Sequence, residues 1–210
     1  MQDYDVVVSL LLLGEAGVGK SCIMQRFAHE PFREGYVPTI GMEFMAPCLP
    51  KYRAKVQIRD TAGNRRYRVG FGAFGGLFRG SRGVILIFDV SDRESFNNLR
   101  HFIRDVEDNS RKGEPLMLLI LGNKADRAAF RVVSAEEALA FAESWNLRYL
   151  ETSAKNNWNI QEAFEYMVEE VVWRLGAAGH RFQQLPGPRT SRRRCWLLAW
   201  LAWLSSPCRC

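Results

Sequence analysis

The segment Gly14-Glu-Ala-Gly-Val-Gly-Lys-Ser21 restricts the possible folds of this chain more than any other feature. It follows a continuous apolar run, Val6–Leu13, and overlaps the start of a segment with helical character, Gly19–Ala28. An apolar run that ends at a glycine is typical of a strand buried inside a parallel sheet. Glycines in such a loop let backbone N–H groups turn inwards and bind an anion. The sequence therefore predicts a strand, a phosphate-binding P-loop and a helix; the alternative is an ordinary glycine-rich turn.

Two side chains add to the chemistry of this loop. Lys20 places a cation at the β- and γ-phosphates of a nucleotide, and Ser21 offers a hydroxyl to Mg²⁺. The backbone supplies the other contacts. The predicted phosphate-binding residues are Gly14, Glu15, Ala16, Gly17, Val18, Gly19, Lys20, Ser21 and Cys22.

The charge of the chain is unevenly distributed. Positions 177–210 hold six of the 29 Lys and Arg residues and none of the 23 Asp and Glu residues. Positions 1–176 are therefore formally neutral, which argues against a nucleic-acid-binding face, whereas the basic tail favours an anionic lipid surface. A length of 210 residues suits one well-packed domain and a tail. We expect a domain over residues 1–176 and a flexible tail over 177–210.

Apolar runs alternate with helical patterns along the domain. This alternation predicts an α/β fold with helices on both faces of a mostly parallel, six-stranded sheet. The predicted strands are Val6–Leu13, Met42–Cys48, Arg53–Arg59, Val84–Phe88, Leu116–Leu121 and Arg148–Glu151. The predicted helices are Gly19–Ala28, Ser95–Ser110, Ser134–Ser144 with a capping box at its start, and Ile160–Leu175. Pro47 predicts that its strand lies at an edge of the sheet.

The segment Asn123-Lys-Ala-Asp126 follows a predicted strand, at the carboxyl end where ligands bind to parallel sheets. The Asp126 carboxylate can accept hydrogen bonds from N1–H and the exocyclic amine of guanine, a pair of donors that adenine lacks. Asn123 can brace the base and the loop, and the stem of Lys124 can cover the ring. Alone this is a common turn sequence, but after a P-loop it favours GTP over ATP. In Thr152-Ser-Ala-Lys155, after the next strand, an N–H at Ala154 can reach the guanine O6.

Two segments between these motifs predict a Mg²⁺ site. Asp60-Thr-Ala-Gly63 follows a strand and supplies a carboxylate near the metal through water, and the N–H of Gly63 can turn towards a γ-phosphate. Thr39, on the loop after the first helix, can add a second hydroxyl. The alternatives are an ordinary turn or cap residue for Asp60 and a surface loop for Thr39. The predicted metal-binding residues are Ser21, Thr39 and Asp60.

In identity and order, five elements resemble those of the small GTPases, and within them the Rab group, over roughly residues 5–175. They are Gly14–Ser21, Thr39–Gly41, Asp60–Gly63, Asn123–Asp126 and Ser153–Lys155. The resemblance implies a switch that binds GTP and GDP with Mg²⁺ as cofactor and hydrolyses GTP to GDP and phosphate. It adds Ser153, Ala154 and Lys155 to the nucleotide-binding residues. It also implies an aromatic ring at Phe32 stacked on the guanine edge, and the alternative is a partly buried loop anchor.

The same resemblance implies that Lys20, Gly63 and Asn64 are the catalytic residues. The family usually has Gln at the position of Asn64, where it orients the attacking water. Asn is shorter by one carbon–carbon bond, ~1.5 Å, and catalytic geometry tolerates an error of only about 1 Å. We therefore expect slow intrinsic hydrolysis, and the alternative function is a GTP-loaded scaffold. Arg59 replaces a Trp that in Rab proteins belongs to a partner-binding aromatic set.

The tail has two features that suit a membrane. Cys208-Arg-Cys210 resembles the doubly prenylated Rab terminus, so we expect lipidation at Cys208 and Cys210. A tryptophan-rich run, Trp196–Leu204, can lie at the membrane interface, and the alternative is that it folds back onto the domain. The implied location is the cytoplasmic face of an intracellular or plasma membrane, with a cytosolic pool and a role in vesicle traffic. The implied partners are an exchange factor, an activating protein, effectors, a prenyl-delivery chaperone and membrane lipid, without nucleic acid.

Overall fold

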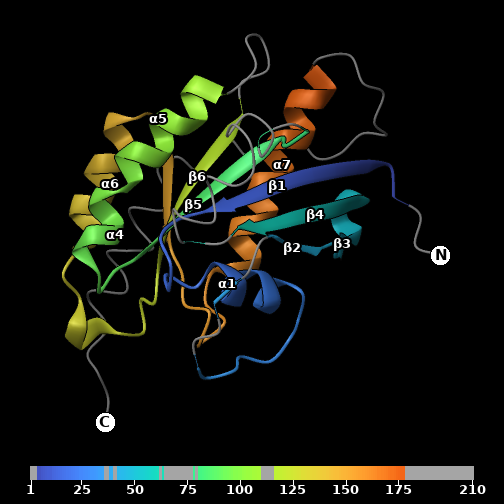
Figure 1. Ribbon diagram of the computed structural model, residues 1–210. Coiled ribbons are helices and arrows are strands. Elements are labelled where there is room, and N and C mark those ends of the chain that lie inside the picture. Colours follow the sequence, from blue (N-terminus) through green and yellow to red (C-terminus); the bar gives the residue numbers. More distant parts are fainter. Residues whose placement is uncertain are drawn as a thin grey trace, which may run out of the picture.

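A computed structural model of the chain describes residues 4–35, 38–39, 42–61, 63, 78, 80–109 and 116–177. Its centre is one twisted sheet with helices on both faces (Figure 1). The strands are β1 (Val6–Leu13), β2 (Met42–Met45), β3 (Cys48–Leu49), β4 (Ala54–Thr61), β5 (Gly83–Asp89), β6 (Met117–Asn123) and β7 (Arg148–Glu151). Their order is β2-β4-β1-β5-β6-β7, with β3 also paired to β4. The predicted α/β fold is confirmed.

The only antiparallel pairings between the named strands are those of β2 and β3 with β4; the other neighbouring strands run parallel. The predicted strand Met42–Cys48 is divided into β2 and β3, but both keep one register against β4. At the break, Val56 N–H donates to the Pro47 carbonyl over 2.9 Å. Pro47 has no N–H with which to return that bond, so the ladder is interrupted there. Its predicted place at the edge is confirmed.

The helices are α1 (Lys20–Phe27), α4 (Arg93–Asn97), α5 (Leu99–Asn109), α6 (Ala135–Ser144) and α7 (Ile160–Ala177), with short 3₁₀ turns η1 (Pro50–Tyr52) and η3 (Ala128–Phe130). The helix predicted from Ser95 begins two residues earlier, because the Asp92 side chain accepts from the N–H groups of Glu94 and Ser95. Only the first half of the predicted capping box of α6 is confirmed: the Ser134 side chain accepts from Glu137 N–H, but the Glu137 carboxylate pairs with Arg93. Among the described residues, no helix has the length and apolarity needed to cross a membrane.

The sheet separates two apolar cores. One core lies between the sheet and helices α1 and α7, where the ring of Phe27 stacks on that of Phe164 with centroids 3.9 Å apart. The other lies under α4, α5 and α6 and includes Phe88, Phe102 and Ala138. Every residue of β5 is buried, as expected for a central strand covered on both faces.

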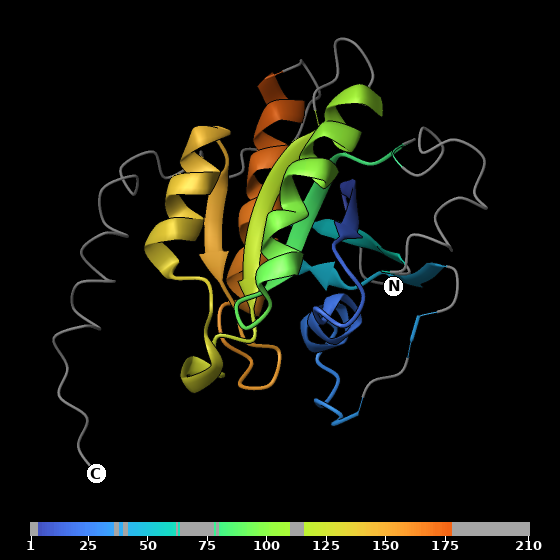
Figure 2. The same ribbon diagram turned by 60° about the vertical axis from the view of Figure 1, so that its left-hand side comes forward.

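Parallel strands bring their carboxyl ends to one edge of the sheet. The loops that follow β1, β6 and β7 therefore lie at the same end of the molecule, beside the start of α1 (Figure 2). These loops contain the P-loop, Asn123–Asp126 and Ser153–Lys155. The fold thus gathers three segments that are far apart in the sequence.

Candidate nucleotide and metal site

The P-loop is arranged around the Lys20 side chain. Lys20 is only 5% exposed, and its Nζ donates to the carbonyls of Gly14 over 3.2 Å and Glu15 over 2.8 Å. These bonds hold the ammonium group beneath the loop backbone. Gly19 caps α1 in a left-handed conformation, so the positive end of the helix dipole meets the loop. The arrangement suits an anion bound against the loop.

Two glycines are required here by close packing. A Cβ on Gly19 would lie 2.4 Å from Nδ2 of Asn123, and a Cβ on Gly63 would lie 2.4 Å from the backbone N of Ala16. Gly63 therefore fits directly against the P-loop, as its predicted role near a γ-phosphate requires. Asn64, the predicted catalytic residue beside it, lies outside the described residues.

The three predicted metal-binding side chains lie together. Ser21 Oγ donates to Asp60 Oδ2 over 2.5 Å and lies 2.8 Å from Thr39 Oγ1, which donates to the same carboxylate oxygen over 3.4 Å. Burial raises the pKa of Asp60, although hydrogen bonds from Ser21 and Thr39 and the charge of Lys20 oppose the shift. The other carboxylate oxygen, Oδ1, is buried and has no hydrogen-bond partner among the described residues.

This donor set fits Mg²⁺. The ion prefers oxygen ligands and usually takes one or two protein groups together with waters and substrate phosphates. Two hydroxyls and one buried carboxylate supply such ligands, and a cation beside Oδ1 would stabilise the charged form of Asp60. In the part of the chain that is described, no group of three or more His, Cys, Asp and Glu side chains is arranged to hold a metal ion.

Asn123 connects the loops on the other side of the site. It is 1% exposed, and its Nδ2 donates to the carbonyl of Val18 in the P-loop over 2.8 Å. Its Oδ1 accepts from Ala154 N–H over 3.3 Å and from Thr152 Oγ1 over 3.4 Å. The predicted bracing of the loop by Asn123 thus has a geometric basis. To donate to guanine O6, the Ala154 N–H would have to give up its long hydrogen bond to Asn123 or divide it between the two acceptors.

Asp126 presents an exposed carboxylate next to this junction. Its Oδ1 accepts from Ser153 Oγ over 2.5 Å, which fixes the orientation of the carboxyl group. Ser153 itself is 1% exposed. Because the Ser153 bond takes only one acceptor site of Oδ1, both oxygens of the oriented carboxylate can still accept, which suits recognition of paired N–H donors.

Lys124 adopts a left-handed conformation with φ of 64° and makes two charge-assisted contacts. Its Nζ donates to the Gly17 carbonyl over 2.7 Å and lies 2.7 Å from Asp89 Oδ2. Burial opposes ionisation of Asp89, but hydrogen bonds from Lys124 and Ser91 outweigh it and hold the pKa of this carboxyl below its usual value. Asp89 was not among the predicted site residues, although its place at the end of a buried strand beside the site was a signal for it.

The remaining predicted residues are less closely joined to the site. Phe32 is half-buried and packs against the core under α1 and α7, which is the loop-anchor alternative. Cys22 also packs against that core, and burial raises the pKa of its thiol. Lys155 Nζ lies 3.3 Å from Glu34, an exposed pair that links the loop after α1 to the loop after β7. The predicted lipidation sites Cys208 and Cys210 lie outside the described residues.

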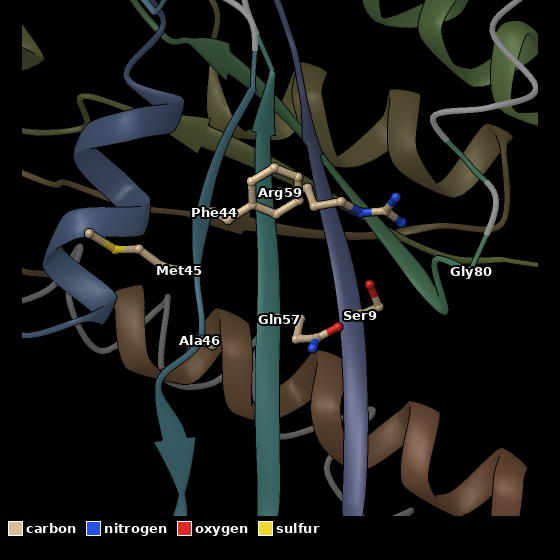
Figure 3. Close-up of a pocket in the computed structure, with 7 residues that line it drawn as sticks. All are labelled: Ser9, Phe44, Met45, Ala46, Gln57, Arg59 and Gly80. Atoms are coloured by element: carbon tan, nitrogen blue, oxygen red, sulfur yellow. The ribbon is translucent and has the colours of Figure 1, made fainter.

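A separate hollow of about 470 Å³ lies on the sheet over β1, β2 and β4. It is lined by Ser9, Phe44, Met45, Ala46, Gln57, Arg59 and Gly80. Figure 3 shows the Arg59 side chain reaching across β1 and the Phe44 ring beside its base. Arg59 donates to the hydroxyl of Ser81, and Phe44 is 66% exposed.

The fold is that of a P-loop protein with a mostly parallel sheet, and the predicted phosphate-binding and metal-binding residues lie at the carboxyl edge of that sheet. The Ras family profile matches residues 9–173. The GTP-binding protein YPTM2 of Zea mays is 38% identical over 181 residues, which cover 83% of this chain and 85% of the relative. The GTP-binding protein ypt1 of Schizosaccharomyces pombe is 38% identical over 176 residues, covering 83% and 84%. The Ras-related protein RABD2c of Arabidopsis thaliana is 38% identical over 177 residues, covering 83% and 85%. The chain belongs to the Ras family and is a Rab-type small GTPase.

Proposed function

We propose that this protein is a molecular switch that binds GTP and GDP with Mg²⁺ and regulates membrane traffic. The observation that carries the proposal is the junction at Asn123, which joins the P-loop to the loop after β7 beside the Asp126 carboxylate. One face of this junction suits phosphates and the other suits a purine base. Relatives named as GTP-binding proteins support the choice of nucleotide.

The phosphates would lie along the P-loop, from Gly14 to Cys22. Lys20 would donate to the β- and γ-phosphates, exchanging its carbonyl contacts with Gly14 and Glu15 for phosphate oxygens. Ser21, Thr39 and Asp60 would hold Mg²⁺, which neutralises charge on the phosphate oxygens when it is bound. Thr39 lies on the loop after α1, so its position would differ between GTP and GDP, as in other nucleotide switches.

The base would lie between Lys124 and the loop Ser153–Lys155. Phe32 would have to turn away from its packing against the core to reach the edge of the base. Asp126 would accept two hydrogen bonds from guanine, and adenine would leave that carboxylate without its donors. A site built to bind polar groups rejects ligands that leave those groups unpaired. Guanine selectivity is therefore expected from Asp126 and its orientation by Ser153.

The proposed reaction is attack of water on the γ-phosphate, giving GDP and phosphate. Lys20 and the N–H of Gly63 would stabilise the charge that develops on the phosphate, and Asn64 would orient the water. The short stem of Asn64 supports a second candidate, a scaffold that stays GTP-loaded because it hydrolyses slowly. Single-turnover hydrolysis by the purified full chain, with and without an activating protein, separates the two. A rate that no activating protein raises favours the scaffold.

The hollow at Phe44 and Arg59 is the proposed contact surface for a partner. Among the described residues that line it there is no carboxylate, but there are a guanidinium, that of Arg59, and an exposed aromatic ring, that of Phe44. It would therefore take a segment that offers a carboxylate to Arg59 and an apolar side chain to Phe44. A peptide-display selection against the GTP-loaded protein tests this. Enriched peptides should pair acidic with apolar residues and lose binding to Arg59→Glu; neutral peptides that still bind this variant would contradict it.

Attachment to a membrane would complete the switch. Two prenyl chains at Cys208 and Cys210 would give a stable anchor, whereas one chain gives only marginal binding. The basic residues of the tail would add attraction to anionic lipid. The protein would then act on the cytoplasmic face of a membrane and be carried through the cytosol by a chaperone.

A further inference from the structure

The loop after β7 is closed by a backbone bridge between Ser153 and Trp158. Ser153 N–H donates to the Trp158 carbonyl over 3.1 Å, and Trp158 N–H donates to the Ser153 carbonyl over 3.0 Å. Asn157, inside the loop, and Asn159, just after it, adopt left-handed conformations with φ of 54° and 56°. Asn159 also donates to the Glu151 carbonyl over 2.8 Å. The loop is therefore fixed at its base, where Trp158 lies.

This bridge places the Trp158 side chain beside that of Ser153. Residues that exchange both N–H···O bonds in an antiparallel pair have side chains on the same face, with Cβ atoms about 5 Å apart. Ser153 Oγ on this face donates to Asp126 Oδ1 over 2.5 Å and accepts from Asn156 N–H over 3.0 Å. Trp158 is thus an immediate neighbour of the hydrogen bond that orients Asp126.

Burial supports a shielding role for the indole ring. Ser153 is 1% exposed, although residues 155–158 of the same loop are exposed. Trp158 is 47% exposed, so about half of its surface is covered. The backbone bridge starts this half-covered side chain next to Ser153, the position from which a large ring can keep water away from that serine. Hydrogen bonds shielded from water are electrostatically stronger than exposed ones.

We propose that Trp158 is a positioning residue for the guanine base, which protects the Ser153–Asp126 hydrogen bond from water and so slows the release of guanine nucleotides. The inference rests on the proposed binding of guanine nucleotides. It assigns a role in setting the lifetime of the bound nucleotide to Trp158, a residue outside the P-loop and outside the Asn123–Asp126 segment. Loss of the ring would let water compete for Ser153 and free the carboxylate of Asp126 to rotate.

The test is the rate at which the full chain releases a fluorescent GDP analogue into excess GTP with Mg²⁺ present. Trp158→Ala should release the analogue about tenfold faster than the wild type, and Trp158→Phe should recover part of the difference. Trp173→Ala is the matched control, because Trp173 on α7 is 51% exposed and should leave the rate unchanged. Equal rates for Trp158→Ala and the wild type would overturn the inference.

A double-mutant cycle distinguishes positioning from a general effect on folding. Ser153→Ala removes the hydrogen bond that the ring protects, so adding Trp158→Ala to that variant should change the rate little further. A full tenfold increase in the Ser153→Ala background would show that the ring acts by another route, and the inference would be wrong. A wild type that does not bind the analogue at all would instead refute the proposed function.

Discussion

Individual polar side chains in the candidate site join segments of the chain through hydrogen bonds. Asp60 is fully buried and receives hydrogen bonds from Ser21 and Thr39, which come from different segments. Asn123 joins the P-loop to the loop after β7 in the same way. A buried polar group is costly when its partners are lost, so substitutions here should alter binding more than their size suggests.

Ser21→Asn should weaken the binding of Mg²⁺ and GTP more than that of GDP. The larger amide replaces the hydroxyl that lies between Thr39 and Asp60, and the γ-phosphate depends on the metal most. We expect at least about a tenfold loss of GTP affinity, equivalent to ~1.4 kcal/mol, in calorimetric titrations at several Mg²⁺ concentrations. Thr39→Ser keeps a hydroxyl and should change little. An unaltered dependence of GTP affinity on Mg²⁺ in Ser21→Asn would show that the metal site is misplaced.

Asn64→Gln should raise the intrinsic rate of hydrolysis. The added methylene restores the reach to the attacking water that the family's usual residue has. The expected gain in single-turnover rate is about tenfold, or ~1.4 kcal/mol of barrier. An activating protein that supplies its own Gln would make the wild-type and variant rates similar. A rate that is unchanged or lower in Asn64→Gln, without any activating protein, would mean that the loop already brings Asn64 within reach.

At the scale of elements, side-chain caps determine where helices begin. Ser134 starts α6, and Glu136 and Glu137 place negative charge in its first turn. Ser134→Ala should lower the free energy of unfolding by about 1 kcal/mol, because the Glu137 N–H loses its acceptor. Ser134→Asp should retain most of the stability. Chemical denaturation of the GDP-loaded chain measures both, and equal midpoints for Ser134→Ala and the wild type would rule out the cap as a source of stability.

The strands were predictable because local pattern and burial agree. The runs of β1, β5 and β6 are apolar on both faces, so their positions follow from sequence. The division of the edge strand at Pro47 and the break between α4 and α5 at Asn98 are local changes of the backbone, which patterns do not resolve. In the candidate site, the motifs predicted Asp60, Asn123 and Asp126, whose side chains make the contacts described above. The contacts of Asp89 with Lys124 and of Ser153 with Trp158 need tertiary structure to be seen.

At the scale of the whole molecule, positions 1–176 are formally neutral, whereas positions 177–210 are basic and include Cys208 and Cys210. Replacing Cys208 and Cys210 with Ser should move the protein from the membrane fraction to the cytosol, because two lipid chains are lost. Fractionation of cells that produce each variant measures this. The Cys195→Ser variant is the control and should stay on membranes. Persistent membrane binding without Cys208 and Cys210 would assign the anchor to Cys195 or Trp196–Leu204.

Competition between GTP and ATP for the purified chain, with Mg²⁺ present, measures whether the site selects guanine nucleotides. The Asp126 carboxylate predicts that GTP binds at least about 100-fold more tightly than ATP, equivalent to ~2.7 kcal/mol. In Asp126→Asn the amide should favour the xanthine nucleotide over GTP, which ties the selectivity to this side chain. Equal affinity of the wild type for GTP and ATP would contradict the account of this protein as a guanine-nucleotide switch.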